Sequence, residues 1–123
     1  MISQVFPIIS TPDLPRALAF YLGLLGGTVE FEYPDADGQV VYAGLDLGES
    51  HLGIGLGPDL PAMPQRHISL WVYTDDCDGT VERLRAAGTP ITEEPADQPW
   101  GERVARVRDP DGNELIIGQR ATG

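Results

Sequence analysis

The chain of 123 residues carries the same landmarks twice, in a fixed register. Asp13 opens a helix-like segment, and Asp76 opens a second one 63 residues later. Asp46, in a turn-like segment before an apolar run, recurs at the same spacing as Asp109. A fixed period in two kinds of landmark indicates a duplicated unit of about 60 residues. The repeat predicts a single domain made of module one (1–57), a linker (58–66) and module two (67–123).

Each module shows the same succession of apolar patterns, with strand-like alternation before and after one helical stripe. The stripes, which predict core residues, are Leu14, Ala17, Leu18, Tyr21 and Leu22 in module one and Cys77, Val81 and Leu84 in module two. Pro7, inside the first strand, argues for an edge strand or for a strand exchanged with a partner. The predicted strands are 4–11, 28–33, 39–47 and 50–56 in module one and 67–73, 90–94, 102–108 and 114–119 in module two, and the predicted helices are 13–22 and 76–87. Each module is therefore expected to be βαβββ, and the fold class α+β.

The charge and the cysteine content exclude several classes of function. The net charge is −11 and all eight basic residues are arginine, which disfavours nucleic acid because a phosphate backbone needs cationic neutralisation. An acidic surface favours solubility or a cationic partner. Cys77 is the one cysteine, so no intrachain disulfide forms, which fits a cytoplasmic setting. We expect no signal peptide, because residues 1–12 lack a basic start followed by a long apolar stretch, and no membrane span, because no apolar run approaches ~18 residues.

Three segments, in order along this duplicated frame, resemble those of one superfamily. They are DLPRALAFYLGLLGG (13–27), TDDCDGTVERLRAAG (74–88) and RVRDPDGNELII (106–117). The chain is thereby similar to the vicinal-oxygen-chelate proteins, which include glyoxalase I, extradiol dioxygenases and bleomycin-resistance proteins. VFPIISTPDL (5–14), WVY (71–73) and QPWGERVARVRDPDGN (98–113) resemble the bleomycin-resistance type. The resemblance implies cup-shaped mixed sheets, commonly paired across a homodimer, but one fold hosts many chemistries.

The resemblance also locates the metal ligands of the superfamily's enzymes, on the first and fourth strands of each module. In this chain those positions are Phe6, Gly53, Ser69 and Ile116. None of these side chains is a metal ligand of the usual kinds, so we expect no metal and no cofactor there. One alternative is a register shifted by two residues, which places His67 where Ser69 stands. Another is an unusual site formed by His51, His67 and Glu114.

The inner face of the cup is expected to bind a small molecule. Strand side chains alternate between faces, and the face opposite the helices offers aromatic rings to a planar ligand. Trp100, in a proline-rich loop, either covers the mouth of the cup or caps the edge of the core. The predicted ligand-binding residues are Phe6, Ile8, His51, Gly53, Gly55, His67, Ser69, Trp71, Tyr73, Trp100 and Ile116.

Glycines and acidic residues add two further expectations. Gly53, Gly55 and Gly57 share one face of a strand, where glycine marks a close approach or a bulge. They indicate either room for a ligand or partner chain, or a strained strand. Residues 109–113 read as a hairpin turn. Four glutamates on strands or turns, interpreted as solvated, together offer attraction for a cationic ligand: Glu30, Glu32, Glu93 and Glu94.

These observations favour a metal-independent protein that binds and sequesters a small planar or cationic molecule, as bleomycin-resistance proteins do. The alternative is a glyoxalase- or dioxygenase-like metalloenzyme with a displaced metal site. A third interpretation is a regulatory or protein–protein module. No nucleophile–base pair is evident, so no catalytic residue is predicted. We expect a homodimer with exchange of the N-terminal strand near Pro7.

Overall fold

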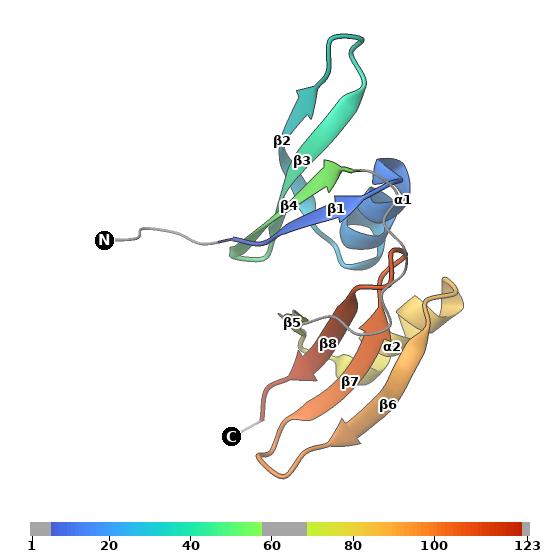
Figure 1. Ribbon diagram of the computed structural model, residues 1–123. Coiled ribbons are helices and arrows are strands. Elements are labelled where there is room, and N and C mark those ends of the chain that lie inside the picture. Colours follow the sequence, from blue (N-terminus) through green and yellow to red (C-terminus); the bar gives the residue numbers. More distant parts are fainter. Residues whose placement is uncertain (1–5, 58–68, 122–123) are drawn as a thin grey trace. The chain divides into compact units, whose positions relative to one another are not determined.

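The computed structural model describes residues 6–57 and 69–121, which belong to two compact units, Met1–Pro61 and Ala62–Gly123 (Figure 1). The first unit contains β1 (Ile8–Thr11), α1 (Leu14–Leu18), the π-helical turn η1 (Ala19–Leu24), β2 (Thr28–Pro34), β3 (Val40–Leu47) and β4 (Ser50–Leu56). The second contains β5 (Leu70–Tyr73), α2 (Cys77–Ala86), β6 (Ile91–Asp97), β7 (Arg103–Arg108) and β8 (Glu114–Gln119). Each unit is βαβββ, so the predicted α+β class is confirmed.

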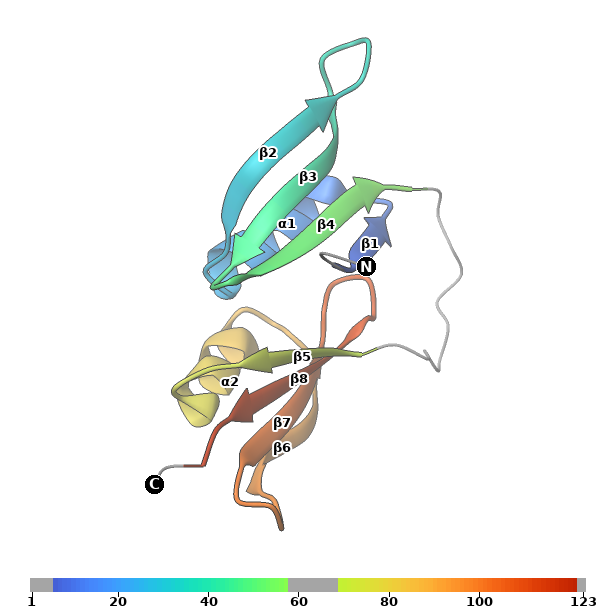
Figure 2. The ribbon, with the colours of Figure 1, turned by 90° about the vertical axis from the view of Figure 1, so that its left-hand side faces the viewer.

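Each unit forms one mixed four-stranded sheet with its helical segment against one face (Figure 2). The strand orders are β1-β4-β3-β2 and β5-β8-β7-β6, with the first pair in each parallel and the others antiparallel. Ile8 lies opposite Gly53, and Trp71 lies opposite Ile116. Both members of the second pair stand 63 residues after their equivalents in the first. The pairing of these parallel strands therefore repeats with the same period as the sequence.

The repeated aspartates cap the helices. The Asp13 carboxylate accepts a hydrogen bond at 3.1 Å from the N–H three residues on, and Asp76 does the same at 3.0 Å. Thr11 and Thr74 accept from the N–H groups of these two aspartates at 3.1 and 3.2 Å. The side chains thus satisfy backbone donors that a helix start leaves without partners.

The first helical segment differs from the predicted α-helix at 13–22. After one turn it continues as the π-helical turn η1, which places an extra residue in the turn. Phe20 is therefore buried beside Tyr21, with ring centroids 5.0 Å apart, while the predicted core residue Leu22 is half-buried. The buried residues shared by this segment and its sheet are Leu14, Ala17, Phe20, Tyr21, Ala43, Leu45, Leu52 and Ile54.

The second core follows the predicted stripe. The fully buried residues of α2 are Cys77, Val81 and Leu84, and they face Ala105, Val107, Leu115 and Ile117 from the sheet. The Cys77 thiol donates to the Ile117 carbonyl at 3.5 Å, and burial raises the pKa of that thiol. In the described parts of the chain, no helix has the length and apolarity needed to cross a membrane.

Several predicted boundaries are corrected. The predicted strands 4–11 and 67–73 begin later, at Ile8 and Leu70, and residues 4–5 and 58–68 lie outside the described part of the chain. β6 runs to Asp97, past the predicted end at 94, because it continues to pair with β7. Pro95 is tolerated there because β6 is an edge strand.

Two sequence interpretations concern the strand ends. β1 is also an edge strand, and the Pro7 carbonyl accepts from the Gly53 N–H at 2.9 Å, so the edge interpretation of Pro7 is confirmed. The turn at 109–113 is confirmed too, because the Asp109 carboxylate accepts from two N–H groups within it. The equivalence of Asp46 with Asp109 is wrong in space. Asp46 lies in β3 opposite His51, where the second unit has Arg108 opposite Glu114.

Candidate functional site

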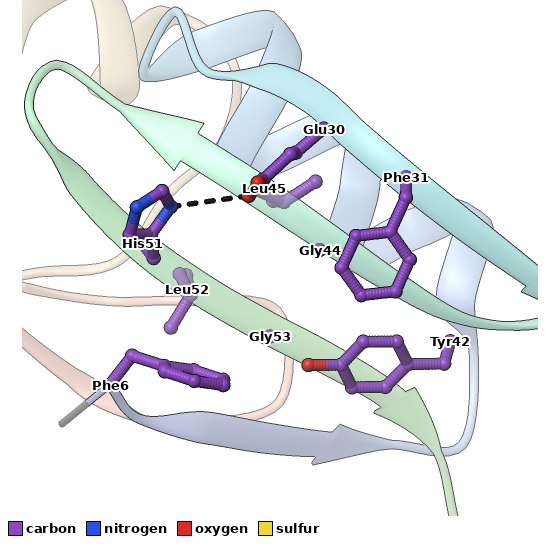
Figure 3. Close-up of a pocket in the computed structure, with 9 residues that line it drawn as sticks. All are labelled: Phe6, Glu30, Phe31, Tyr42, Gly44, Leu45, His51, Leu52 and Gly53. Carbon is purple, nitrogen blue, oxygen red and sulfur yellow. Dashed lines mark ion pairs between the residues drawn. The ribbon is translucent and has the colours of Figure 1, made fainter. Parts of the chain in front are cut away.

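A pocket of about 170 Å³ opens on the first sheet, on the face that points away from the helical segment (Figure 3). Its walls come from β2, β3 and β4, with one residue from the chain just before β1. The lining residues are Phe6, Glu30, Phe31, Tyr42, Gly44, Leu45, His51, Leu52 and Gly53. The pocket therefore combines aromatic rings, a glycine floor and a polar end.

Glycine makes the floor possible because aromatic rings lie directly on it. A Cβ atom at Gly53 would overlap the Tyr42 hydroxyl, and one at Gly44 would come within 2.6 Å of the Phe31 ring. These two rings lie 5.7 Å apart at an interplanar angle of 33°. The room predicted above Gly53 and Gly55 is thus filled largely by Tyr42, and the opening lies beside the rings instead.

Glu30 and His51 form the polar end of the pocket, and with Asp46 they make a cluster of three side chains from three adjacent strands. His51 Nδ1 lies 2.6 Å from Asp46 Oδ1 and 3.2 Å from Glu30 Oε2. Asp46 and His51 are cross-strand neighbours on β3 and β4. Glu30 sits in a bulge of β2, where Val29 and Phe31 pair with successive residues of β3. A bulge re-aims a side chain, and here the Glu30 carboxylate reaches the histidine.

The second unit fills the equivalent place with its own side chains. Register places Ile116 where the first unit has Gly53, and Arg106 where it has Gly44. Glu93, opposite Arg106, takes the place of Phe31. Arg106 forms ion pairs with Glu93 at 3.1 Å and with Glu114. The two modules therefore share a backbone plan, but only the first has glycines at these two floor positions.

The predicted aromatic face of the second unit is organised around one carboxylate. Tyr73 donates its hydroxyl proton to Glu102 at 2.8 Å, and the Trp100 indole donates to the other oxygen at 2.7 Å. Arg120 lies over the Tyr73 ring at 4.2 Å, in a cation–π contact. The hydrogen bond to Glu102 is the main reason that the Tyr73 pKa is raised. Trp100 is thereby held to Glu102 and is more than half exposed.

Trp71 supports this face from β5. Its ring centroid lies 5.8 Å from that of Tyr73, and its indole nitrogen would be 2.8 Å from a Cβ at Gly118. One ring surface of Tyr73 is thus taken by Arg120, and Trp71 rests on the glycine of the neighbouring strand. These aromatic side chains contact protein atoms in part, and each remains substantially exposed.

The residues at the superfamily's metal positions do not fit a metal ion. The parallel registers confirm that Gly53 and Ile116 are equivalent, and neither side chain has a donor atom. Phe6 is apolar, and Ser69 is exposed just before β5.

The two alternative metal sites both involve His67, and the positions of their residues bear on each. His67 lies outside the described residues. Glu114, the third member of the unusual site, belongs to the second unit and is paired with Arg106. The pocket brings His51 together with a different pair of carboxylates, those of Glu30 and Asp46.

Sequence reasoning found part of the pocket. Of the predicted ligand-binding residues, Phe6, His51 and Gly53 line this pocket, whereas Ile8 and Gly55 do not. Phe31, Tyr42 and Gly44 were missed. The alternation of Tyr42 and Gly44 with two buried residues of β3 is a signal that places them on this face.

Comparison with known proteins agrees with this architecture. The family model described as "Glyoxalase/Bleomycin resistance protein/Dioxygenase superfamily" matches residues 2–117. "Putative glyoxylase CFP32" of Mycobacterium bovis is 38% identical over 101 residues, which are 82% of this chain but 37% of that protein. The chain thus spans little more than a third of that relative.

Two solved structures are similar over nearly their whole length. TioX from Micromonospora sp. ML1 is 25% identical with a TM-score of 0.76, and the match covers 98% of each chain. A bleomycin resistance determinant encoded on the transposon Tn5 is 25% identical with a TM-score of 0.72, covering 98% of this chain and 100% of that one. The family match over residues 2–117 and the duplicated βαβββ plan agree. This chain belongs to the Glyoxalase/Bleomycin resistance protein/Dioxygenase superfamily.

Proposed function

We propose that this protein binds and sequesters a small planar molecule in the pocket of the first unit, without a metal at the superfamily's ligand positions. The observation that carries the proposal is the set of three rings, Phe6, Phe31 and Tyr42, around a glycine floor. Flat rings favour stacking with a planar ligand, and the Glu30 carboxylate at one end favours positive charge on it. A relative that is a bleomycin resistance determinant supports sequestration as the role.

The volume of the pocket limits the size of the ligand that it can enclose. Its volume of about 170 Å³ is below the ~300–1,000 Å³ typical of pockets that enclose drug-sized ligands. We therefore propose that one ring system enters while the rest of the ligand lies on the surface. Sequestration of this kind fits a cytoplasmic homodimer, in which two equivalent pockets serve one assembly.

The test is a thermal-shift screen with bleomycin, an acridine cation and a neutral tricyclic analogue of the acridine. Binding to the native state should add about 2.7 kcal/mol of stability at a hundredfold excess of free ligand over Kd. Phe31→Leu should weaken that shift. Tyr33→Leu is the matched control, because Tyr33 is an exposed aromatic of the same strand that does not line the pocket.

Two results would contradict the proposal. One is that no planar compound stabilises the protein. The other is that Trp71→Leu removes the shift while Phe31→Leu keeps it, which would move the site to the second unit.

A second candidate function is a metalloenzyme of the glyoxalase or dioxygenase type with a displaced metal site. The observation in its favour is the Glu30–Asp46–His51 cluster beside the pocket, together with the similarity to "Putative glyoxylase CFP32". It predicts turnover that stops on chelation of metal and is absent from His51→Ala. Ligand binding that survives chelation, without turnover, favours sequestration.

A further inference from the structure

We infer that Glu30, Asp46 and His51 form a binding site for a divalent transition-metal ion such as Zn²⁺ or Mn²⁺. This site is separate from the superfamily's metal positions and goes beyond the proposed binding of planar molecules, which does not require it. The ligand atoms of the three side chains all lie within 4.8 Å of one another. One imidazole nitrogen with two carboxylate oxygens is a donor set that binds divalent metal ions of intermediate softness.

The backbone holds these three groups in place from separate strands. Asp46 and His51 face each other across the β3–β4 ladder, at the end next to the hairpin turn. Glu30 arrives from β2 through the bulge between Val29 and Phe31. A regular strand would pair Glu30 in the ladder, whereas a bulged residue is free to point toward the cluster. Ligands fixed on a sheet lose little freedom on binding an ion.

The two closest atoms of the cluster form an ion pair. His51 Nδ1 and Asp46 Oδ1 lie 2.6 Å apart and both atoms are shielded from solvent, although their geometry does not make a hydrogen bond. A divalent ion would replace this contact, with the two side chains moving apart so that an imidazole nitrogen and a carboxylate oxygen both bind it.

Charge balance points the same way. In the second unit, Arg106 neutralises Glu93 and Glu114, and Glu114 occupies the position equivalent to His51. The first unit has no such arginine at its site: within the described residues, Glu30 and Asp46 have His51 as their charged partner. Two carboxylates beside one imidazole carry excess negative charge, and a divalent ion compensates it.

The metal and a cationic planar ligand would compete, because both are attracted to the same carboxylates. By linkage, each weakens the binding of the other to the same extent. Loading with metal should therefore lower the affinity for an acridine cation and leave the affinity for the neutral tricyclic analogue nearly unchanged.

The experiment is titration of the metal-free full chain with Zn²⁺ and Mn²⁺ by calorimetry, with NMR of the imidazole nitrogens. The chain has two histidines, so the two sets of signals are separable. We expect one Zn²⁺ per chain and a shift of the His51 signals. Since loss of an outer-shell partner alone costs metal affinity about 10–100-fold, His51→Ala should cost at least that much. Asp46→Asn, which keeps the side-chain shape, should weaken binding in the same direction.

His67→Ala is the matched control and should bind Zn²⁺ as the parent does. The inference is overturned if no ion binds, since the three side chains then form an ion-pair cluster and nothing more. It is also overturned if His67→Ala abolishes binding while His51→Ala keeps it. Phe31→Leu should keep metal binding while losing planar ligands, so the failure of one proposal is distinguishable from the failure of the other.

Discussion

Single glycines decide where the aromatic rings of this protein lie. Gly53 and Gly44 admit Tyr42 and Phe31 onto the sheet, and in the second unit Gly118 admits Trp71. Glycine usually weakens a strand, but a ring packed over it restores contact area. The rings then define one wall of the pocket, so residues without side chains shape the site.

Gly53→Ala should therefore lower the affinity for a planar ligand. The new methyl group would overlap the Tyr42 hydroxyl, which lies at the far end of a side chain that is able to swing into the pocket. The free energy of unfolding should change by less than about 1 kcal/mol, because alanine also suits a strand better than glycine. Thermal-shift titration measures both effects.

Gly55→Ala is the control for this substitution, because its Cβ would lie 3.6 Å from the Tyr42 ring, an ordinary contact. Equal ligand affinity in the two variants would show that the position of Tyr42 does not limit the pocket.

Glu102→Gln should lower the pKa of Tyr73 toward the ordinary tyrosine value. The hydrogen bond to the Glu102 carboxylate is the first cause of the raised pKa, and burial and the charge of Glu102 add to it. A raised phenol pKa in the folded state contributes stability below the unfolded value near 10, and this is lost as pH rises through the folded pKa. Absorbance titration of tyrosinate, with parallel unfolding at alkaline pH, measures both. An unchanged titration in the variant would contradict the assigned cause.

Residues of the candidate site could be predicted from the sequence where the alternation of side chains along a strand alone determines which face of the sheet they occupy. Phe6, His51 and Gly53 follow from alternation along the edge strand and β4. Glu30 and Phe31 did not follow, because the bulge in β2 breaks the period and turns two neighbouring side chains toward the pocket. The position of a bulge depends on how two strands pair, and the sequence pattern of one strand alone does not contain that information.

At the scale of elements, the two modules keep the same caps but not the same helices. α2 has the predicted stripe, whereas the first helical segment inserts the π-helical turn η1 that its sequence did not reveal. Helix starts were predictable because an aspartate before an apolar stripe satisfies backbone donors locally. The π turn depends on packing Phe20 and Tyr21 together against the sheet, which is a tertiary effect.

Asp76→Ala should destabilise the fold by about 1 kcal/mol, within the ~0.5–2 kcal/mol range of N-cap losses. The carboxylate bonds to the Gly79 N–H, and its loss leaves that donor without this partner at the start of α2. Asp75→Ala removes the same charge one residue earlier, from an exposed position outside the cap, and serves as the control. Denaturant unfolding measures the difference, and equal stability of the two variants would refute the capping role.

At the scale of the whole molecule, charge is unevenly divided. Met1–Pro61 holds eight of the 19 acidic residues but, in Arg16, one of the eight basic ones. The carboxylates of the second unit find arginines nearby, as in the pairs of Arg103 with Asp78 and Asp97. With a single arginine against eight acidic residues, the first unit has less such compensation, so its pocket lies in the part of the chain with the stronger attraction for cations.

The exposed edge of β1 predicts a homodimer formed through the N-terminal strand. β1 is a short edge strand, and an unpaired strand edge is a ready template for another chain. Ile8, beside Pro7, is 60% exposed and offers apolar surface to a second chain at this edge. Ile8→Asp should therefore shift the protein toward monomer, as measured by sedimentation equilibrium and native mass spectrometry. Tyr33→Asp, on the opposite edge strand β2 and 66% exposed, should leave the dimer intact. A monomeric parent protein, or dissociation by Tyr33→Asp alone, would place association elsewhere and remove the case for strand exchange near Pro7.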